Sequence, residues 1–268
     1  MASGDDSRRS SSRAQRITLI ALSASLYAVG SYITSYIESP WGIGQFRPAV
    51  VIPFFFAVAY GPAVGGLGAA LGTFLASLIR YGQPFLTLVS GTPGNLAGFY
   101  LVGLLHKRFT WPKFLAVSFL GLLVGNLIAA FGVLLAAYLG LYPPIAGMTA
   151  QPPGVQASFV LGLTLFWMVT MWPFILVLVP LMLRSASGLL PDHIRTHLLR
   201  PNEARFSFSL SFSMVGLLAL LIGVIALQFP GAFAPAGTAA VGAISTVFTA
   251  IGVLLLGAGL LHALRGSK

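Results

Sequence analysis

Long apolar runs, separated by short polar segments, make up most of the chain. A membrane-spanning helix needs roughly 20 apolar residues. Gly61-Pro62 predicts a tight turn between the second and third runs, and the segment 141–154 is too rich in proline and glycine to continue a helix. Eight runs approach the required length and predict eight transmembrane helices, at about 17–37, 46–61, 62–80, 85–105, 112–141, 156–183, 206–228 and 239–264.

The composition agrees with a membrane protein and excludes other classes. Of the 268 residues, 57% are hydrophobic and 7% are charged, and the mean hydropathy of +0.91 is far above that of soluble domains. The net charge of +10 does not indicate nucleic-acid binding, because the basic residues lie between the apolar runs. The absence of cysteine excludes disulfides and thiolate metal sites. We therefore predict an all-α membrane protein.

The distribution of basic residues predicts the orientation. If the N-terminus is cytoplasmic, thirteen of the fifteen Lys and Arg residues and all four His residues fall on the cytoplasmic side, as the positive-inside rule requires. Both termini are then cytoplasmic, and the chain is a multi-pass protein of the cell membrane. The two exceptions, Arg47 and Arg80, lie outside together with Glu38, the one acidic residue on that side.

The polar segments divide the chain into four parts. Residues 1–16 predict a disordered basic cytoplasmic tail, and residues 17–185 hold the first six spans. Residues 186–205 predict a cytoplasmic linker with a short helix after Pro191, and residues 206–268 predict a two-span hairpin to which the sequence assigns no role. The apolar residues of the short helix share one face, which predicts that it lies on the membrane surface: Leu190, Ile194 and Leu198.

Several kinds of chemistry are absent from the sequence. There is no G-x-x-x-x-G-K-[ST] phosphate-binding loop, so the chain does not hydrolyse ATP in the usual way. None of the five acidic residues lies deep within a predicted span, whereas proton-coupled transporters usually carry buried carboxylates. Metal-ligand clusters and a paired nucleophile and base are also lacking. These absences argue against an enzyme and a cofactor or metal, and more weakly against a self-sufficient secondary transporter or channel.

Three segments resemble one known family. They are ALSASLYAVG (21–30), FRPAVVIPFFFAVAYGPAVGGLGAALGTFLASL (46–78) and PFLTLVSGTPGNLAGFYLVGLL (84–105). A first helix with small residues, a Gly-Pro turn into a Gly/Ala-rich third helix and a Gly-rich fourth helix resemble the S component of energy-coupling factor (ECF) transporters. The resemblance covers about 17–183, and the last two predicted spans are additional to it.

The resemblance implies a fold, a function and partners. An S component is a six-span substrate-binding bundle, here residues 17–185, that captures a vitamin-like micronutrient outside the cell. It works in the lipid bilayer with a transmembrane T component and two ATPase subunits, which supply the energy. The family docks through an A-x-x-x-A motif on the first helix, which matches Ala24 and Ala28, with Ala21 one turn earlier. Alternatively, these alanines pack against the protein's own helices.

The resemblance also implies where the substrate binds. In this family the site lies in the outer half of the bundle, among the last three of the six helices and under external loops. Here the loop after the first span carries Glu38 and Trp41, and Arg47 and Arg80 flank the same surface. Arginine donates two parallel hydrogen bonds to a carboxylate or phosphate. The alternatives for the two arginines are contact with lipid headgroups and a salt bridge to Glu38.

Three residues within the spans complete the candidate site. Asn95 lies in the middle of the fourth span, and Thr164 and Trp167 lie in the outer half of the sixth. A tryptophan face stacks well on a flat heterocycle, and an amide in hydrocarbon must find a partner. These residues therefore contact the substrate or hold helices together, while Asn126 is expected to be structural. Because no histidine is external, we predict a flat or anionic organic micronutrient rather than a metal ion.

Overall fold

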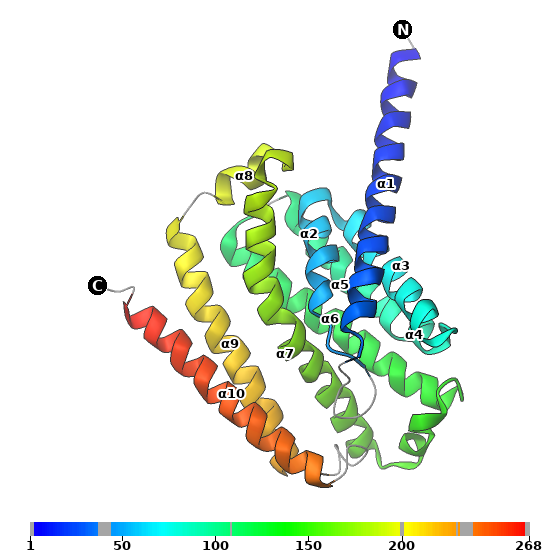
Figure 1. Cartoon of the computed structure of the whole chain (residues 1–268), viewed down its shortest axis with the longest axis vertical. Coiled ribbons are helices and arrows are strands. Elements are labelled where there is room, and N and C mark those ends of the chain that lie inside the picture. Colours follow the sequence, from blue (N-terminus) through cyan, green and yellow to red (C-terminus); the bar gives the residue numbers. More distant parts are fainter. Residues whose placement is uncertain are drawn as a thin grey trace.

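The computed structural model describes residues 3–36, 44–107, 109–198, 201–228, 230 and 238–265. These residues form an all-α bundle (Figure 1). In chain order, its α-helices and 3₁₀ segments (η) are α1 (Ser3–Thr34), η1 (Pro48–Val50), α2 (Val51–Tyr60), α3 (Pro62–Tyr81), α4 (Phe85–Val89), α5 (Gly91–Gly103), η2 (Leu104–Lys107), α6 (Trp111–Tyr138), η3 (Pro143–Ala150), α7 (Pro153–Ser185), η4 (Ser187–Leu189), α8 (Asp192–Leu198), α9 (Pro201–Gln228) and α10 (Thr238–Arg265).

Six helices within the described residues are long and apolar enough to cross a membrane. They correspond to six of the eight predicted spans and confirm the prediction of an all-α membrane protein. The other two predicted spans, 46–61 and 85–105, have different structures, so the predicted number of eight crossings is not confirmed. The six apolar stretches are Arg13–Thr34, Pro62–Tyr81, Trp111–Tyr138, Pro153–Ser185, Ser209–Gln228 and Ser245–Leu264.

The second predicted span is a short helix in the core. The 3 residues of η1 and the 10 of α2 make roughly 20 Å of helix at about 1.5 Å per residue, whereas the hydrocarbon layer is about 30 Å thick. α2 packs against α1, α3, α5 and α7, and most of its residues are buried. A helix that is apolar on all sides suits this position. Gly61, with a φ of 94°, makes the predicted tight turn into α3.

The fourth predicted span is broken into two helices. α4 ends at Val89, α5 begins at Gly91, and Ser90 between them is not helical. Pro93 explains the break, because proline has no N–H to donate to the carbonyl of Val89 and its ring collides with that carbonyl in a continuous helix. In the first turn of α5 the same proline is tolerated. The prediction of one helix over 85–105 is therefore wrong.

Small residues allow α3 to lie close to three neighbouring helices. A Cβ added to Gly72 would lie 2.8 Å from the carbonyl oxygen of Ala24 on α1, and one added to Gly65 would lie 2.2 Å from the Cβ of Ala57 on α2. One added to Gly66 would lie 3.0 Å from a carbonyl oxygen of α5. Glycine at these positions thus fixes the spacing between α3 and its neighbours.

The predicted docking alanines lie mostly inside the bundle. Ala24 and Ala28 are each 3% exposed, and the backbone of Ala24 faces Gly72 of α3. Ala21 is exposed on the other side of α1. The docking prediction therefore needs a correction: Ala24 and Ala28 pack within this chain, and only Ala21 of the three remains available to a partner.

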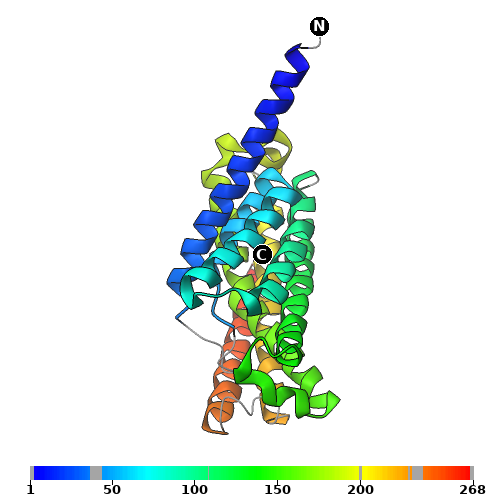
Figure 2. The same ribbon diagram turned by 90° about the vertical axis from the view of Figure 1, so that its right-hand side faces the viewer.

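The N-terminal segment and the linker both differ from the predictions. α1 begins at Ser3 and projects beyond the bundle (Figure 2), so the segment 1–16, for which the sequence predicts disorder, is helical from that residue. The sequence has no proline or glycine between Asp5 and Val29 to interrupt the helix. α8 is the short helix predicted in the linker, but Leu190 and Ile194 are buried in the protein core. The prediction that this face lies on the membrane surface is therefore wrong.

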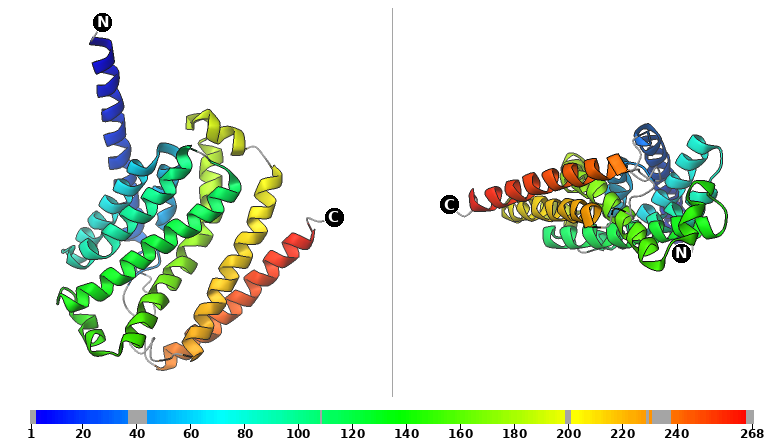
Figure 3. Two further views of the ribbon diagram at one scale, coloured as in Figure 1. Left: turned by 180° about the vertical axis from the view of Figure 1, so that it is seen from behind. Right: turned by 90° about the horizontal axis from the view of Figure 1, so that it is seen from below.

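The last two helices form an antiparallel pair beside α7 (Figures 1 and 3). α9 joins the core through Val215, Leu218 and Ile222 and packs on α7 and α6. α10 packs along the outer side of α9, and only 11% of its apolar stretch is buried. Most of the α10 surface therefore faces the surroundings of the bundle, as expected for a membrane helix at the edge of the bundle.

Candidate ligand-binding site

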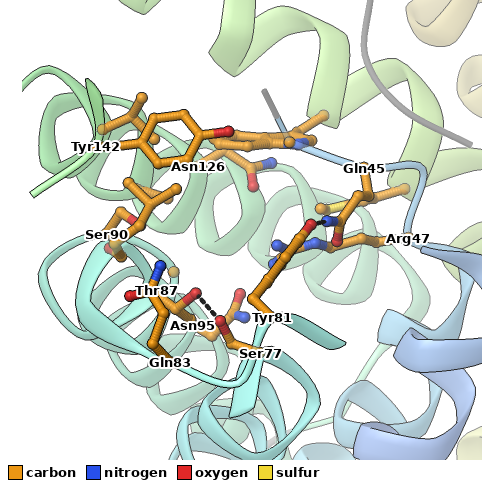
Figure 4. A pocket seen from close by; sticks show the side chains of 17 residues that line it. Gln45, Arg47, Ser77, Tyr81, Gln83, Thr87, Ser90, Asn95, Asn126 and Tyr142 are labelled. Atoms are coloured by element: carbon orange, nitrogen blue, oxygen red, sulfur yellow. Dashed lines mark hydrogen bonds between the residues drawn. The ribbon is translucent and has the colours of Figure 1, made fainter. Parts of the chain in front are cut away.

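A pocket lies at the end of the bundle where α1 and α3 finish (Figure 4). It contains about 910 Å³ of space free of protein atoms, a volume that includes open solvent at its mouth. The segment before η1, the end of α3, α4, the start of α5, and α6 and α7 contribute to its wall. Its polar and tryptophan side chains are Gln45, Arg47, Ser77, Tyr81, Gln83, Thr87, Ser90, Asn95, Asn126, Tyr142 and Trp167.

Arg47 lies just before η1, and its side chain points into the pocket (Figure 4). The residue is partly buried. No hydrogen bond or ion pair joins its guanidinium to any residue that the structure describes. A Cβ added to Gly91 would lie 3.6 Å from Nη1 of Arg47, so the guanidinium faces the first turn of α5. A partly buried cation without a partner is unfavourable, which makes this group available to an anion.

Two further donors on the pocket wall lack an acceptor. Asn126 on α6 is 5% exposed and Trp167 on α7 is 4% exposed. Within the described part of the chain, neither Nδ2 of Asn126 nor Nε1 of Trp167 has a hydrogen-bond partner. Gly44, with a φ of 83°, lies against the indole, because a Cβ there would be 2.6 Å from Cζ2 of Trp167. Buried donors are normally hydrogen-bonded, so these two indicate contact with a ligand or water.

The wall formed by α3, α4 and α5 is hydrogen-bonded internally. Asn95 donates through Nδ2 to the hydroxyl of Thr73 and, at 3.4 Å, to the hydroxyl of Tyr27. The hydroxyl oxygens of Ser77 and Thr87 are 2.6 Å apart and form a hydrogen bond between α3 and α4. Asn95 therefore satisfies both alternatives raised by the sequence, since it joins helices and also lines the pocket.

Arg80 lies beside this pocket, in a smaller neighbouring one. Its Nη1 donates to Oγ of Ser35 at 2.8 Å, and its Cζ lies 4.6 Å from the ring centroid of Tyr36 and 5.3 Å from that of Tyr81. The hydroxyl of Tyr36 donates to that of Tyr32 at 3.1 Å, and this hydrogen bond raises the pKa of Tyr36 above its ordinary value. Tyr36 therefore stays neutral, and its contact with Arg80 is a cation–π interaction.

The other predicted site residues have different outcomes. Thr164 is 1% exposed and donates to the carbonyl of Val160 on its own helix at 2.8 Å; it is not part of the pocket wall. Glu38 and Trp41 lie outside the described residues, so their role stays a prediction. The pocket brings together three of the predicted residues: Arg47, Asn95 and Trp167.

The sequence interpretation missed much of the pocket wall. Asn126 was expected to be structural because of its depth, yet it lines the pocket with an unpaired amide nitrogen. Thr87 lies just before the helix break, and Ser90 lies at the break. Pro93 is the signal that could have located this break, and with it the polar residues that the break brings to the pocket.

Comparison with known proteins identifies the family. Residues 11–160, more than half of the chain, match the family model described as the ECF-type riboflavin transporter, S component. The chain belongs to this S-component family. The resemblance to S components is thereby confirmed, over a shorter range than the predicted 17–183. No curated protein and no solved structure shows significant similarity to the chain.

As an S component, the chain is a multi-pass membrane protein and a transporter subunit rather than an enzyme. The matched residues extend from α1 to the beginning of α7 and include Arg47, Asn95 and Asn126. Trp167 and the α9–α10 pair follow the matched region. Within the described residues, no three His, Asp or Glu side chains are grouped as metal ligands.

Proposed function

We propose that this S component is the substrate-binding subunit of an ECF importer and captures a small vitamin-like nutrient in the pocket around Arg47. The observation that carries the proposal is the set of unpaired donors on the pocket wall, within and next to the region that matches the family. Delivery to the inside then requires a T component and two ATPase subunits. Riboflavin is the first candidate substrate, because the family description names it.

The proposed orientation places both termini in the cytoplasm and the pocket outside. Arg16 of α1, His106 after α5 and Pro191 before α8 line one groove at the other end of the bundle from the pocket. That end also carries Lys107, and a concentration of positive charge at one end supports a cytoplasmic location. We propose eight crossings, in which η1 with α2 and the α4–α5 pair complete the six long helices.

Binding and transport measured separately test the proposal. The purified chain, reconstituted in liposomes, should bind riboflavin or another extracted nutrient without transporting it, because its sequence has no G-x-x-x-x-G-K-[ST] phosphate-binding loop for ATP. Flux should appear only when a T component and ATPases are added together with ATP. Flux through liposomes that contain this chain alone would favour the alternative, a self-sufficient secondary transporter or channel. Absence of binding to any nutrient would contradict a capture function.

Partner docking is proposed for the exposed face of α1. This face carries Ala21 with Leu22, Leu26 and Val29. Ala21→Trp should therefore weaken assembly with a T component while leaving substrate binding intact, since the added ring meets no helix of this chain. Ala24→Trp is the comparison, and it should unfold or destabilise the isolated chain because Ala24 is buried. Normal assembly of Ala21→Trp with the T component would contradict docking through this face.

A further inference from the structure

Three groups of hydrogen-bond donors line the pocket: the guanidinium of Arg47, the first turn of α5 and the amide of Asn126. Arg47 points into the pocket and faces the first turn of α5, and Asn126 points into the same cavity from α6 (Figure 4). We infer that these groups form an oxyanion subsite and that the transported nutrient carries a carboxylate or phosphate. The inference rests on the proposed function and specifies the chemical class of its substrate.

The described residues that line the pocket do not balance the charge of Arg47. Among the described residues that line the pocket there is no Asp or Glu, and the guanidinium of Arg47 has no hydrogen bond or ion pair within the described ranges. An unpaired charge that is partly withdrawn from water is costly. A bound carboxylate or phosphate offsets this cost through charge-assisted, bidentate hydrogen bonds to the guanidinium, whereas a neutral ligand does not.

The start of α5 adds to the same preference. Its first N–H groups have no partners within the helix, and the N-terminus of a helix carries a partial positive charge that favours anions. Ser90, the N-cap residue, makes no side-chain cap to these groups, and Ser90 and Gly91 both line the pocket. Gly91 has no side chain to separate the helix terminus from Nη1 of Arg47.

Asn126 provides an independent observation. Its side chain is 5% exposed, and its Nδ2 has no acceptor in the described part of the chain. The amide comes from α6, a different element from both Arg47 and the start of α5. A buried donor that is unpaired at this position is available to an acceptor on a ligand, and an oxyanion supplies several.

The subsite should distinguish between two ligands that differ only in a phosphate group. Riboflavin has no ionised group at neutral pH, whereas riboflavin 5′-phosphate carries the oxyanion that the three donors would bind. If the nutrient is a flavin, the phosphate ester should bind more tightly than riboflavin itself. If it is another compound, it should be an organic anion. The flat ring of such a ligand has Trp167 available on the α7 side of the pocket.

The first experiment is mass spectrometry of small molecules released when the purified full-length chain is denatured. The variants are Arg47→Gln and Arg47→Lys, with Arg195→Gln as the matched control, because Arg195 is exposed on α8 and pairs there with Asp192. An organic anion at near-equal stoichiometry should be released from the wild type and the control. Arg47→Gln should retain at most about a tenth of the compound that the wild type retains, and Arg47→Lys should retain an intermediate amount.

A second variant keeps the test decisive if Arg47→Gln fails to fold. Asn126→Asp puts a carboxylate in place of the amide that faces the pocket, so it should repel an anionic ligand while altering the shape very little. Loss of the compound from this variant supports the subsite, and full retention overturns it. Riboflavin and riboflavin 5′-phosphate, titrated against the wild type and Asn126→Asp, provide the matched pair of probes.

The outcomes distinguish the subsite from the proposed function. A released compound that is neutral, or an anion that Arg47→Gln retains in full, overturns the oxyanion subsite and leaves nutrient capture standing. If the wild type releases no compound and binds neither flavin, the capture function and the subsite both fail.

Discussion

The pocket and the α9–α10 pair differ in whether some of their polar groups have partners. In the helix pair, Oγ of Ser209 lies 2.7 Å from Nδ1 of His262, and Ser245 donates to the carbonyl of Gly223 at 3.0 Å. In the pocket, Arg47 and Asn126 carry donors without partners among the described residues. Paired polar groups hold helices together, whereas donors left unpaired on the wall of a pocket are available to a ligand. The difference distinguishes the pocket from the helix pair.

The two regions share close glycine contacts between helices. On α9 and α10, small residues recur every seven positions and face one another across the pair. This spacing keeps one face of each helix in contact with the other. In the pocket region, Gly132 of α6 lies under the break between α4 and α5. The seven-residue series are Ser209, Gly216 and Gly223 on α9 and Ser245, Gly252 and Gly259 on α10.

The largest effect is expected where a glycine supports the pocket. A Cβ at position 132 would lie 2.2 Å from the carbonyl oxygen of Val89 and 2.4 Å from Cα of Ser90. Gly132→Val should therefore displace the helix break and lower the affinity for the captured nutrient by about 100-fold, on the order of 3 kcal/mol. Isothermal titration calorimetry, or the amount of nutrient retained by the purified protein, measures this affinity. Gly147→Val, where a Cβ meets nothing within 4 Å, is the control, and equal affinities for both variants would contradict this account of the pocket.

A smaller effect, on stability alone, is expected in the helix pair. A Cβ on Gly252 would lie 2.6 Å from Cγ of Leu220 and 2.8 Å from the carbonyl oxygen of Gly216. Gly252→Val should push α10 from α9 and destabilise the protein by about 1–3 kcal/mol, while nutrient affinity changes by less than about twofold because Gly252 does not line the pocket. Thermal unfolding in detergent, compared with Gly257→Val on the same helix, tests this. A large loss of affinity would mean that the pair takes part in binding.

The smallest expected effects concern two tryptophans on α7. Nε1 of Trp172 donates to Oγ of Ser118 at 2.8 Å, whereas Nε1 of Trp167 has no partner in the described structure. Trp172→Phe should lower stability by about 1 kcal/mol through the lost hydrogen bond and leave affinity unchanged. Trp167→Phe should leave stability unchanged and reduce the affinity for the nutrient by about tenfold. If both variants lose only stability, Trp167 is a packing residue.

Hydropathy predicted the long helices well, because each must satisfy its backbone hydrogen bonds internally within lipid. It failed for 46–61, where most residues of α2 are buried by protein instead of lipid, and for 85–105, which is broken at Ser90. An average over a window also cannot detect the break that Pro93 causes. The first error arises because composition reports that a segment avoids water and does not report what surrounds it.

The candidate site was predictable only in part for a related reason. Arg47 was identified because charge is rare and conspicuous outside the membrane, and it does line the pocket. Asn126 was not, because an amide within a span has the same sequence signature whether it joins helices or faces a cavity. Ala24 and Ala28 match a docking motif, yet the same spacing of small residues also suits packing against α3. Only the three-dimensional arrangement separates these alternatives.

The short length of η1 and α2 has a consequence for how the nutrient is held. These segments make roughly 20 Å of helix, so in a hydrocarbon layer of about 30 Å the segment with Arg47 lies below the membrane surface if the other end of α2 is at the opposite face. Dissolved ions screen charges in water over about 8–10 Å at physiological ionic strength, and they screen buried charges much less. Capture of an anionic nutrient by Arg47 should thus persist in media of high ionic strength.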